Sequence, residues 1–546
     1  MTPMKNVFRI AAVSLLGFGS AQAADTMVPG VARRLTVEQY TRVIADTFGP
    51  TVKIGGRFDP DVRVDGLIEV GAAQVSVSST SLSQYDAMAR SIAAQVVNED
   101  NRLTMLPCKP ASATAPDDAC AGKFLAKVGG SLFRRPLTPA EIEHQVRTAA
   151  NATETVKDFY QGLSLTLASM LTAPEFLFRV ESVEADPANR GGYRLDSAGK
   201  ATRLAFFLWN GAPDEELLRA AQKSELDTPK GLEKQVNRMM ASGRLKDGIR
   251  AFFDDMLQLA GMDDVMKDGA LFPKFSSQIA GEAREQTLRT IVGVVTAPKG
   301  DYRDIFTTKK TFLTPGLASI YKVPLAFDAP IGAPDYWKAY EFKAEDPRAG
   351  ILVQTSFVTM NSHPGRSSPT LRGKALREVL LCQKVPAPPA DVNFTIVQDT
   401  SNPVYRTARD RLIAHRTNPV CGGCHKLIDP MGLALENFDG GGAFRTTENG
   451  VKIDTSGEID GVKFADAAGL GQAIHDNPAA ASCLVQRLTA YGLGRTPKKD
   501  ETWVETQKAA FIKNNYSVPG LMRSLALSPE FYRAVPNEIK AAFNTP

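Results

Sequence analysis

The sequence has no marked excess of charge of either sign, and it has few cysteines. Lys and Arg together number 64 and Asp and Glu 60, so the formal net charge of +4 is small for a chain of 546 residues. This balance argues against a nucleic-acid binder, which usually carries a concentrated basic excess. Six cysteines are too few for a disulfide-dense scaffold, but they suffice for a couple of bridges and one covalent or metal site.

Long hydrophobic runs are also lacking, since spanning a bilayer takes about 20 apolar residues. The N-terminus has a basic start at Lys5 and Arg9, an apolar stretch at 10–18 and a small-x-small sequence that ends at Ala23. These three parts predict a secretory signal peptide that is cleaved after Ala23, rather than a transmembrane anchor. We therefore expect a periplasmic or secreted chain without a transmembrane segment, in a compartment that permits disulfides.

The rest of the composition is that of an ordinary globular protein, 43% hydrophobic and 23% charged, which predicts roughly two to four folding units. Most of the chain has helical patterning, so the predicted fold is mainly α. Two helix starts carry a capping box, Thr36 with Gln39 and Thr138 with Glu141, and Pro139 occupies the first position of the second helix.

Two segments depart from this helical pattern, and two others share a short sequence. Residues 298–345 are richer in Pro, Gly and Asp and are expected to be loop-like, and residues 385–389 predict a stiff extended linker. Residues 173–176 and 528–531 share a Pro-Glu-Phe phrase, followed within three residues by an arginine. The phrase is interpreted either as the remnant of an internal repeat or as a shared helix–turn–helix phrase.

The motif that carries chemistry is Cys421-Gly422-Gly423-Cys424-His425. C-x-x-C-H is the attachment signature of c-type haem. Two thiols one helical turn apart can each add to one vinyl group of a porphyrin, and the adjacent histidine supplies the proximal nitrogen to iron. The single motif predicts one covalent haem c. A zinc site and a redox dithiol are the alternatives, disfavoured because a second paired motif and a flanking βαβ pattern are lacking.

The other four cysteines are expected to form two bridges. Cys108 and Cys120 lie 12 residues apart in a loop rich in Pro, Ala and Asp, which favours a local disulfide. Cys382 and Cys483 flank the motif, and in an oxidising compartment two spare thiols more often pair than stay free. That second bridge would tie the C-terminal helical segment to the haem unit.

The sixth iron ligand is left open by the sequence. His415, six residues before the motif, is favoured as the second metal ligand, His363 comes next, and an open or water-ligated iron is the remaining alternative. Met431 would have to wrap tightly round the haem edge. The full set of candidates is His415, His363, Met431, Met360, His475 and Met522.

Four arginines and one acidic segment are further candidates for ligand contacts. Arg445, Arg366, Arg372 and Arg495 are candidates to neutralise the haem propionates, and a solvated surface arginine is an equal alternative for each. Residues 454–461 carry several oxygen ligands but lack the full EF-hand register, so a turn between two strands is expected rather than a calcium loop.

Several short sequence motifs along the chain form one recognisable set. They lie at 133–138, 208–214, 368–373, 415–425, 428–439 and 491–495. Together they resemble the large secreted c-type cytochrome family of planctomycetes, myxobacteria and some proteobacteria, whose members are strings of domains of unknown function. The resemblance implies haem c, an exported location and a haem-pocket or axial role for His415, but no substrate. Many relatives carry an extra N-terminal haem motif, whereas this chain has one.

The expected organisation is several helical modules and a cytochrome c-like haem unit with a small irregular or β segment. The expected boundaries are 1–23 for the signal peptide, 24–105, 106–190 and 191–345 for helical modules, 346–470 for the haem domain and 471–546 for a last helical module. The favoured function is an exported monohaem cytochrome that exchanges electrons with a periplasmic redox partner. The alternatives are a haem oxidoreductase, with a substrate pocket built by the helical modules, and an outer-surface assembly protein with structural haem.

Overall fold

The computed structural model describes residues 30–333, 336–387, 395–415, 419–498 and 501–535. It is 56% helical, which confirms the predicted mainly α class. The predicted signal peptide, residues 388 and 389 of the predicted linker, and residues 416–418 lie outside the described residues. Within the described ranges, no helix combines the length and the apolar character needed to cross a membrane.

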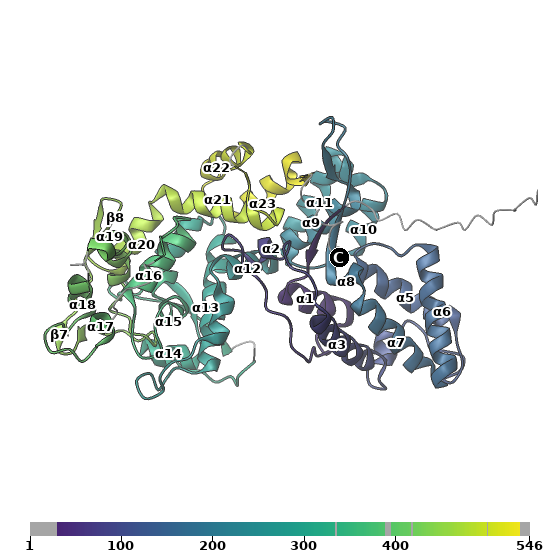
Figure 1. Cartoon of the computed structure of the whole chain (residues 1–546), viewed down its shortest axis with the longest axis horizontal. Coiled ribbons are helices and arrows are strands. Elements are labelled where there is room, and N and C mark those ends of the chain that lie inside the picture. Colours follow the sequence, from purple (N-terminus) through teal and green to yellow (C-terminus); the bar gives the residue numbers. More distant parts are fainter. Residues whose placement is uncertain (1–29, 334–335, 388–394, 416–418, 499–500, 536–546) are drawn as a thin grey trace, which may run out of the picture.

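The first part of the chain is a helical bundle, on the right in Figure 1. Both predicted capping boxes are present: Thr36 caps the helix α1, and Thr138 caps α6, where Pro139 is at the first position. The helices pack around an apolar core that runs from Leu35 to Leu177 and takes in Phe206 from the next helical region. The helices are α1 (Val37–Phe48), α2 (Ile68–Gly71), α3 (Ser79–Val97), α4 (Arg102–Met105), α5 (Asp118–Phe133), α6 (Pro139–Val156), α7 (Phe159–Thr172) and α8 (Pro174–Leu177).

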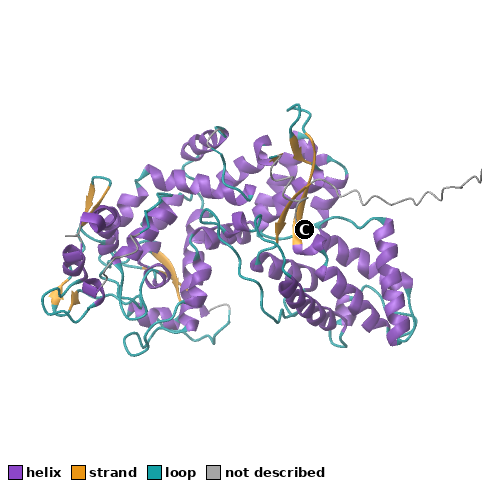
Figure 2. Ribbon diagram, in the orientation of Figure 1, coloured by secondary structure: helices purple, strands orange, loops and turns teal. Residues whose placement is uncertain are grey.

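The largest sheet joins the two ends of the described chain (Figure 2). Its order is β1-β2-β3-β10 and all pairs are antiparallel. Both Pro-Glu-Phe sequences follow a helix after a break of one residue and form a second, short helix. This short helix leads into a strand of the sheet, α8 into β2 and the 3₁₀ helix Pro529–Tyr532 into β10. The strands are β1 (Gly30–Arg34), β2 (Phe178–Ala185), β3 (Tyr193–Leu195) and β10 (Arg533–Ala534).

The middle of the chain is helical, with one small two-stranded antiparallel sheet. Residues 298–345 are less irregular than predicted, because β4 pairs with β5 and α14 lies between them. The paired residues of β4 and β5 lie about 30 positions apart in the sequence. Pairing between such distant residues leaves little signal in the local sequence. The elements are α9 (Ser197–Trp209), α10 (Glu215–Gln222), α11 (Pro229–Ala241), α12 (Leu245–Met256), α13 (Ser277–Val295), β4 (Lys310–Leu313), α14 (Pro315–Tyr321) and β5 (Lys338–Glu341).

The motif and two small hairpins lie on the left in Figure 1, and the last helices of the chain extend from there across the top of the view toward its centre. The acidic segment 454–461 leads into the hairpin β8–β9, with Asp460 and Gly461 at positive φ in its turn, as predicted for a turn between two strands. The elements are α15 (Thr355–Met360), α16 (Pro369–Ala375), α17 (Thr395–Gln398), α18 (Ala408–His415), α19 (Pro419–Leu433), β6 (Thr447–Glu448), β7 (Val451–Lys452), β8 (Gly457–Ile459), β9 (Val462–Phe464), α20 (Ala467–His475), α21 (Pro478–Leu493), α22 (Trp503–Lys513) and α23 (Val518–Leu527).

A buried ion cluster, the junction cluster, joins four regions of the sequence. It consists of Arg33 on β1, Glu69 on α2, Arg179 and Glu181 on β2, and Arg203 on α9, and all five side chains are at most 4% exposed. Arg33 and Arg203 both donate to Oε2 of Glu181, at 2.8 and 3.0 Å. Arg33 and Arg179 share Oε1 of Glu69. Each carboxylate is therefore held by at least two guanidinium groups.

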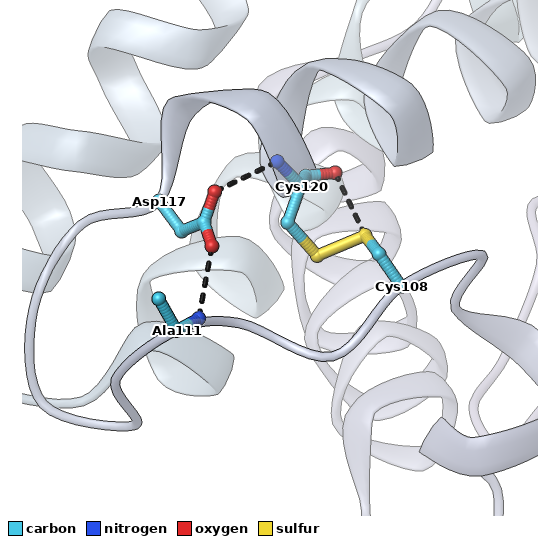
Figure 3. The surroundings of a disulfide bond; sticks show 4 residues. All are labelled: Cys108, Ala111, Asp117 and Cys120. Carbon is cyan, nitrogen blue, oxygen red and sulfur yellow. Dashed lines mark hydrogen bonds between the residues drawn. A yellow bond between two sulfur atoms is a disulfide. The ribbon is translucent and has the colours of Figure 1, made fainter.

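Two disulfides brace the fold. Cys108 and Cys120 are bridged at the start of α5, where Asp117 accepts hydrogen bonds from the backbone N–H groups of Cys120 and Ala111 (Figure 3). Cys382 and Cys483 are bridged across 101 residues, which fastens α21 to the segment that follows α16. Both predicted pairings are confirmed.

Candidate functional site

The helix α19 carries the whole C-x-x-C-H motif. All six cysteines lie among the described residues, and only Cys421, which is buried, and Cys424, which is half-buried, are outside a disulfide. A helix turns once in 3.6 residues, so the two thiols lie one turn apart and His425 follows directly. This is the thiol arrangement that thioether attachment to one porphyrin requires.

The helices α16 and α19 are in backbone contact. A Cβ atom on Gly432 would lie 1.7 Å from the carbonyl oxygen of Pro369, and one on Gly373 would lie 1.9 Å from that of Ile428. A side chain at either position would force the helices apart, because real Cβ atoms essentially never come this close to another atom. Two glycines therefore set the spacing between α16 and the motif helix.

The Nδ1 atom of His425 is within hydrogen-bond distance of a buried carboxylate. Its Nδ1 lies 2.9 Å from Oδ2 of Asp429, one turn further along α19, and Asp429 is fully buried. The other carboxylate oxygen, Oδ1, accepts a hydrogen bond of 3.0 Å from Oγ1 of Thr370 on α16. With Nδ1 occupied in this way, Nε2 is the nitrogen of His425 that is available to a metal.

His415, which the sequence analysis favoured as the second metal ligand, lies against His425. The centroids of the two rings are 4.9 Å apart and their planes are inclined by 75°. His415 belongs to the buried face of α18, together with Ala408, Arg411 and Leu412. Burial lowers the pKa of His415, and His425 lowers it further, which favours the neutral imidazole, the form that binds metals.

The other candidates for the sixth position have different surroundings. Met431, on α19 itself, and Met522 are fully buried in the main apolar core. His475 pairs with Asp476 and Asp304. His363 forms a backbone bridge with Arg366. Within the described residues, His415 is the only histidine whose ring contacts that of His425.

Met360 completes this set of candidates. It is partly buried at the end of α15, where it packs against apolar core residues. Its sulfur would be 3.4 Å from a Cβ atom on Gly261, which places it beside the 3₁₀ helix Leu259–Asp264. The residue therefore has a packing role in the interior.

Two of the four arginines proposed for propionates hold the loop after α19. Arg372 is fully buried and donates to Glu436 and to the backbone carbonyl groups of Leu435, Phe438 and Asp439. Arg445 donates to Oε2 of Glu436 at 2.9 Å and to the hydroxyl of Ser367 at 3.1 Å. These arginines are engaged as parts of the fold.

Arg495 and Arg366 differ from that pair and from each other. Arg495 pairs with Glu501 at 2.7 Å, beyond the end of α21. Arg366, which is half-buried, forms no side-chain hydrogen bond or ion pair with the part of the chain that the structure describes, and burial lowers its pKa, with Arg411 lowering it further. Of the four arginines, Arg366 is therefore the one whose charge is available to an anionic group.

The described ranges contain no group of three or more His, Cys, Asp or Glu side chains arranged to hold a metal ion. The zinc alternative thus finds no four-ligand set around the motif there. The dithiol alternative is disfavoured by the helical surroundings, since α18 and α16 flank the motif helix rather than a βαβ unit.

A polar cleft of about 260 Å³ lies between α1, α12 and α13. It is lined by both acidic and basic side chains, and its arginines are already paired with its acids, as Arg284 is with Asp254. None of its lining residues belongs to α16, α18 or α19. The lining residues are Glu38, Arg250, Asp254, Asp263, Gly281, Arg284, Glu285 and Leu288.

The sequence analysis missed Asp429 and Thr370. The spacing of four residues between His425 and Asp429 on one predicted helix was the available signal, because side chains at i and i+4 share a helix face. Thr370 had no such signal, since it reaches Asp429 from a helix 59 residues earlier in the chain.

Comparison with protein families finds five matches that follow one another along most of the chain. No curated protein and no solved structure matches it. Each match is to a protein of unknown function: DUF1587 at 33–98, DUF1595 at 120–181, DUF1592 at 195–323, DUF1588 at 348–448 and DUF1585 at 460–531. Domains of the DUF1588 and DUF1585 types are associated with cytochrome c-like proteins. The chain therefore consists largely of these five domains of unknown function, one after another.

Proposed function

We propose that the chain is an exported monohaem c-type cytochrome that transfers electrons. The observation that carries the proposal is the pair of free thiols on α19, one turn apart, next to a histidine whose Nδ1 is already hydrogen-bonded. The other four cysteines are paired in disulfides, so the motif thiols are the ones available for thioether bonds. Two disulfides and a predicted signal peptide support export, which thioether attachment requires.

Each residue of the proposed site has one role. Cys421 and Cys424 would form the thioether bonds, and Nε2 of His425 would bind the iron. His415 would supply a second iron ligand, and Arg366 would neutralise a propionate. When bound, the haem supplies a one-electron couple between ferric and ferrous iron.

The distal role of His415 requires a local movement. The present separation of 4.9 Å between the centroids of His415 and His425 is that of a direct ring contact and leaves no room for a porphyrin between the rings. His415 is the last residue of α18, next to residues 416–418. A shift of this helix end relative to α19 would open the space.

Electron transfer is proposed in preference to catalysis on an organic substrate. A buried, neutral histidine beside His425 is suited to closing the sixth position, and a six-coordinate low-spin iron favours transfer. The polar cleft between α1, α12 and α13 shares no lining residue with the motif helices, so it gives no support to a substrate pocket at the haem.

The test is expression of the full chain with the machinery for c-type cytochrome maturation. We expect a haem-stained band on a denaturing gel, a mature N-terminus at Ala24 and low-spin ferric optical and EPR spectra. Replacing His415 with Ala should convert the spectrum to high spin, and an unchanged spectrum would remove His415 as a ligand. A chain without covalent haem would overturn the proposal. Clear spectral changes on adding peroxide or small ligands to the native protein would contradict the electron-transfer role.

A further inference from the structure

The fully buried carboxylate behind His425 has a role beyond packing. We propose that Asp429 is a positioning residue that keeps the proton of His425 on Nδ1, presents Nε2 to iron and favours the ferric state. This inference rests on the proposed function, because it concerns the ligand of the same haem. It assigns to Asp429 and its partner Thr370 the tuning of the reduction potential.

The hydrogen bonds supply the geometry for this role. The hydroxyl of Thr370 donates to Oδ1 of Asp429 at 3.0 Å, and Nδ1 of His425 lies 2.9 Å from Oδ2. The proposal takes Asp429 as an ionised carboxylate, which only accepts hydrogen bonds. The proton of the bond to His425 then sits on Nδ1, which leaves the lone pair on Nε2.

The position of Asp429 is set by rigid packing on both sides. The close approach of Gly373 to Ile428 and of Gly432 to Pro369 brackets Asp429 along α19. These backbone contacts hold Thr370 on α16 at a fixed distance from the carboxylate. A ligand whose hydrogen-bond partner is itself held in place keeps its ring orientation when the iron changes charge.

The negative charge of the carboxylate predicts in which direction Asp429 shifts the reduction potential of the iron. A carboxylate that accepts the second N–H of a ligating histidine makes the imidazole more basic. Asp429 is fully buried, so its negative charge acts through a medium of low dielectric constant rather than through water. Both effects stabilise ferric iron over ferrous iron and lower the reduction potential.

The test is a spectroelectrochemical titration of the full-length holoprotein and two variants. Asp429→Asn keeps the shape of the side chain and a hydrogen-bond acceptor but removes the negative charge. At a fixed potential we expect the ratio of ferrous to ferric protein to rise about tenfold, which corresponds to a reduction potential higher by roughly 59 mV. Thr370→Val removes the donor to Oδ1 and makes the carboxylate a stronger acceptor for His425. We expect a smaller shift in the opposite direction.

Opposite signs separate tuning from a general disturbance of the fold, which would move both potentials the same way. NMR of the ferric protein adds a second readout: the Nδ1 proton of His425 should exchange with solvent slowly in the native chain and faster in Asp429→Asn. Equal potentials for the native chain and Asp429→Asn, or shifts of the same sign in both variants, would overturn the assignment while leaving the cytochrome proposal intact. Loss of haem in Asp429→Asn alone would also overturn it. A native chain without covalent haem would overturn both.

Discussion

The junction cluster and the motif site are both buried polar assemblies, yet they differ in what they leave available. In the junction cluster, Glu181 is held by Arg33 and Arg203, and both oxygens of Glu69 are occupied. At the motif, the hydrogen bonds of Asp429 are satisfied, but two thiols stay free and Nε2 of His425 has no hydrogen bond with the described residues. The junction cluster pairs its charges with one another and serves the architecture, whereas the motif site is suited to binding a group from outside the chain.

The largest expected effect is the loss of covalent haem when the free thiols of the motif site are removed. Replacing Cys421 and Cys424 together with Ala should abolish covalent haem, because no other thiol of the chain is free. The matched control is the double replacement of Cys108 and Cys120 with Ala, which should keep haem attached. Haem staining of a denaturing gel measures both variants, and covalent haem in the first variant would contradict the assigned attachment site.

A change in the junction cluster should affect stability rather than haem. Glu181→Gln leaves Arg203 buried without a counter-ion and leaves Arg33 with Glu69 as its remaining one, and breaking a buried ion pair costs about 3–5 kcal/mol. Urea unfolding should report this loss of free energy of unfolding, with the haem content unchanged. A loss below about 1 kcal/mol would mean that the cluster does not hold the junction together.

The junction cluster also predicts a loss of stability in acid. Burial alone would raise the pKa of Glu181, but Arg203, Arg33 and Arg179 lower it to about 2. Because this pKa lies below the usual value of 4.5, the stabilisation is present above about pH 4.5 and is lost as the pH falls toward 2, by about 3 kcal/mol. Unfolding titrations at pH 6 and pH 3 should show it, and Glu181→Gln should lack this part of the pH dependence. An equal pH dependence in both proteins would contradict the account.

The smallest expected effect is the difference between the two disulfides in how much each contributes to the free energy of unfolding. In the chain-entropy model, a bridge across 101 residues contributes about 4.7 kcal/mol and one across 12 residues about 3 kcal/mol. Removing Cys382–Cys483 should therefore cost about 2 kcal/mol more than removing Cys108–Cys120, as measured by urea unfolding of the two double Ala variants. An equal cost would show that the longer bridge acts chiefly through local contacts.

Features with a local cause were predictable from the sequence. The caps Thr36 and Thr138 bond to residues three positions away, and the short bridge between Cys108 and Cys120 closes a loop of 12 residues. The C-x-x-C-H spacing placed the thiols and His425 on one helical turn, and the structure has them on α19.

Features that depend on distant partners were not predictable in this way. Arg33 meets Glu181 across 148 positions, and Thr370 meets Asp429 across 59. Composition and periodicity do not encode such pairings, because only packing of the helices and strands creates them. For the same reason the roles of Arg445 and Arg372 became visible only when Glu436 was found between them.

The central claim is that Cys421 and Cys424 carry one haem. Its most direct test is mass spectrometry of the chain after export and maturation, followed by analysis of the peptide that spans residues 419–433. The account predicts the mass of one haem added to this peptide through both cysteines, and no added haem elsewhere. Two unmodified thiols in this peptide, in a cell that matures another c-type cytochrome normally, would contradict it.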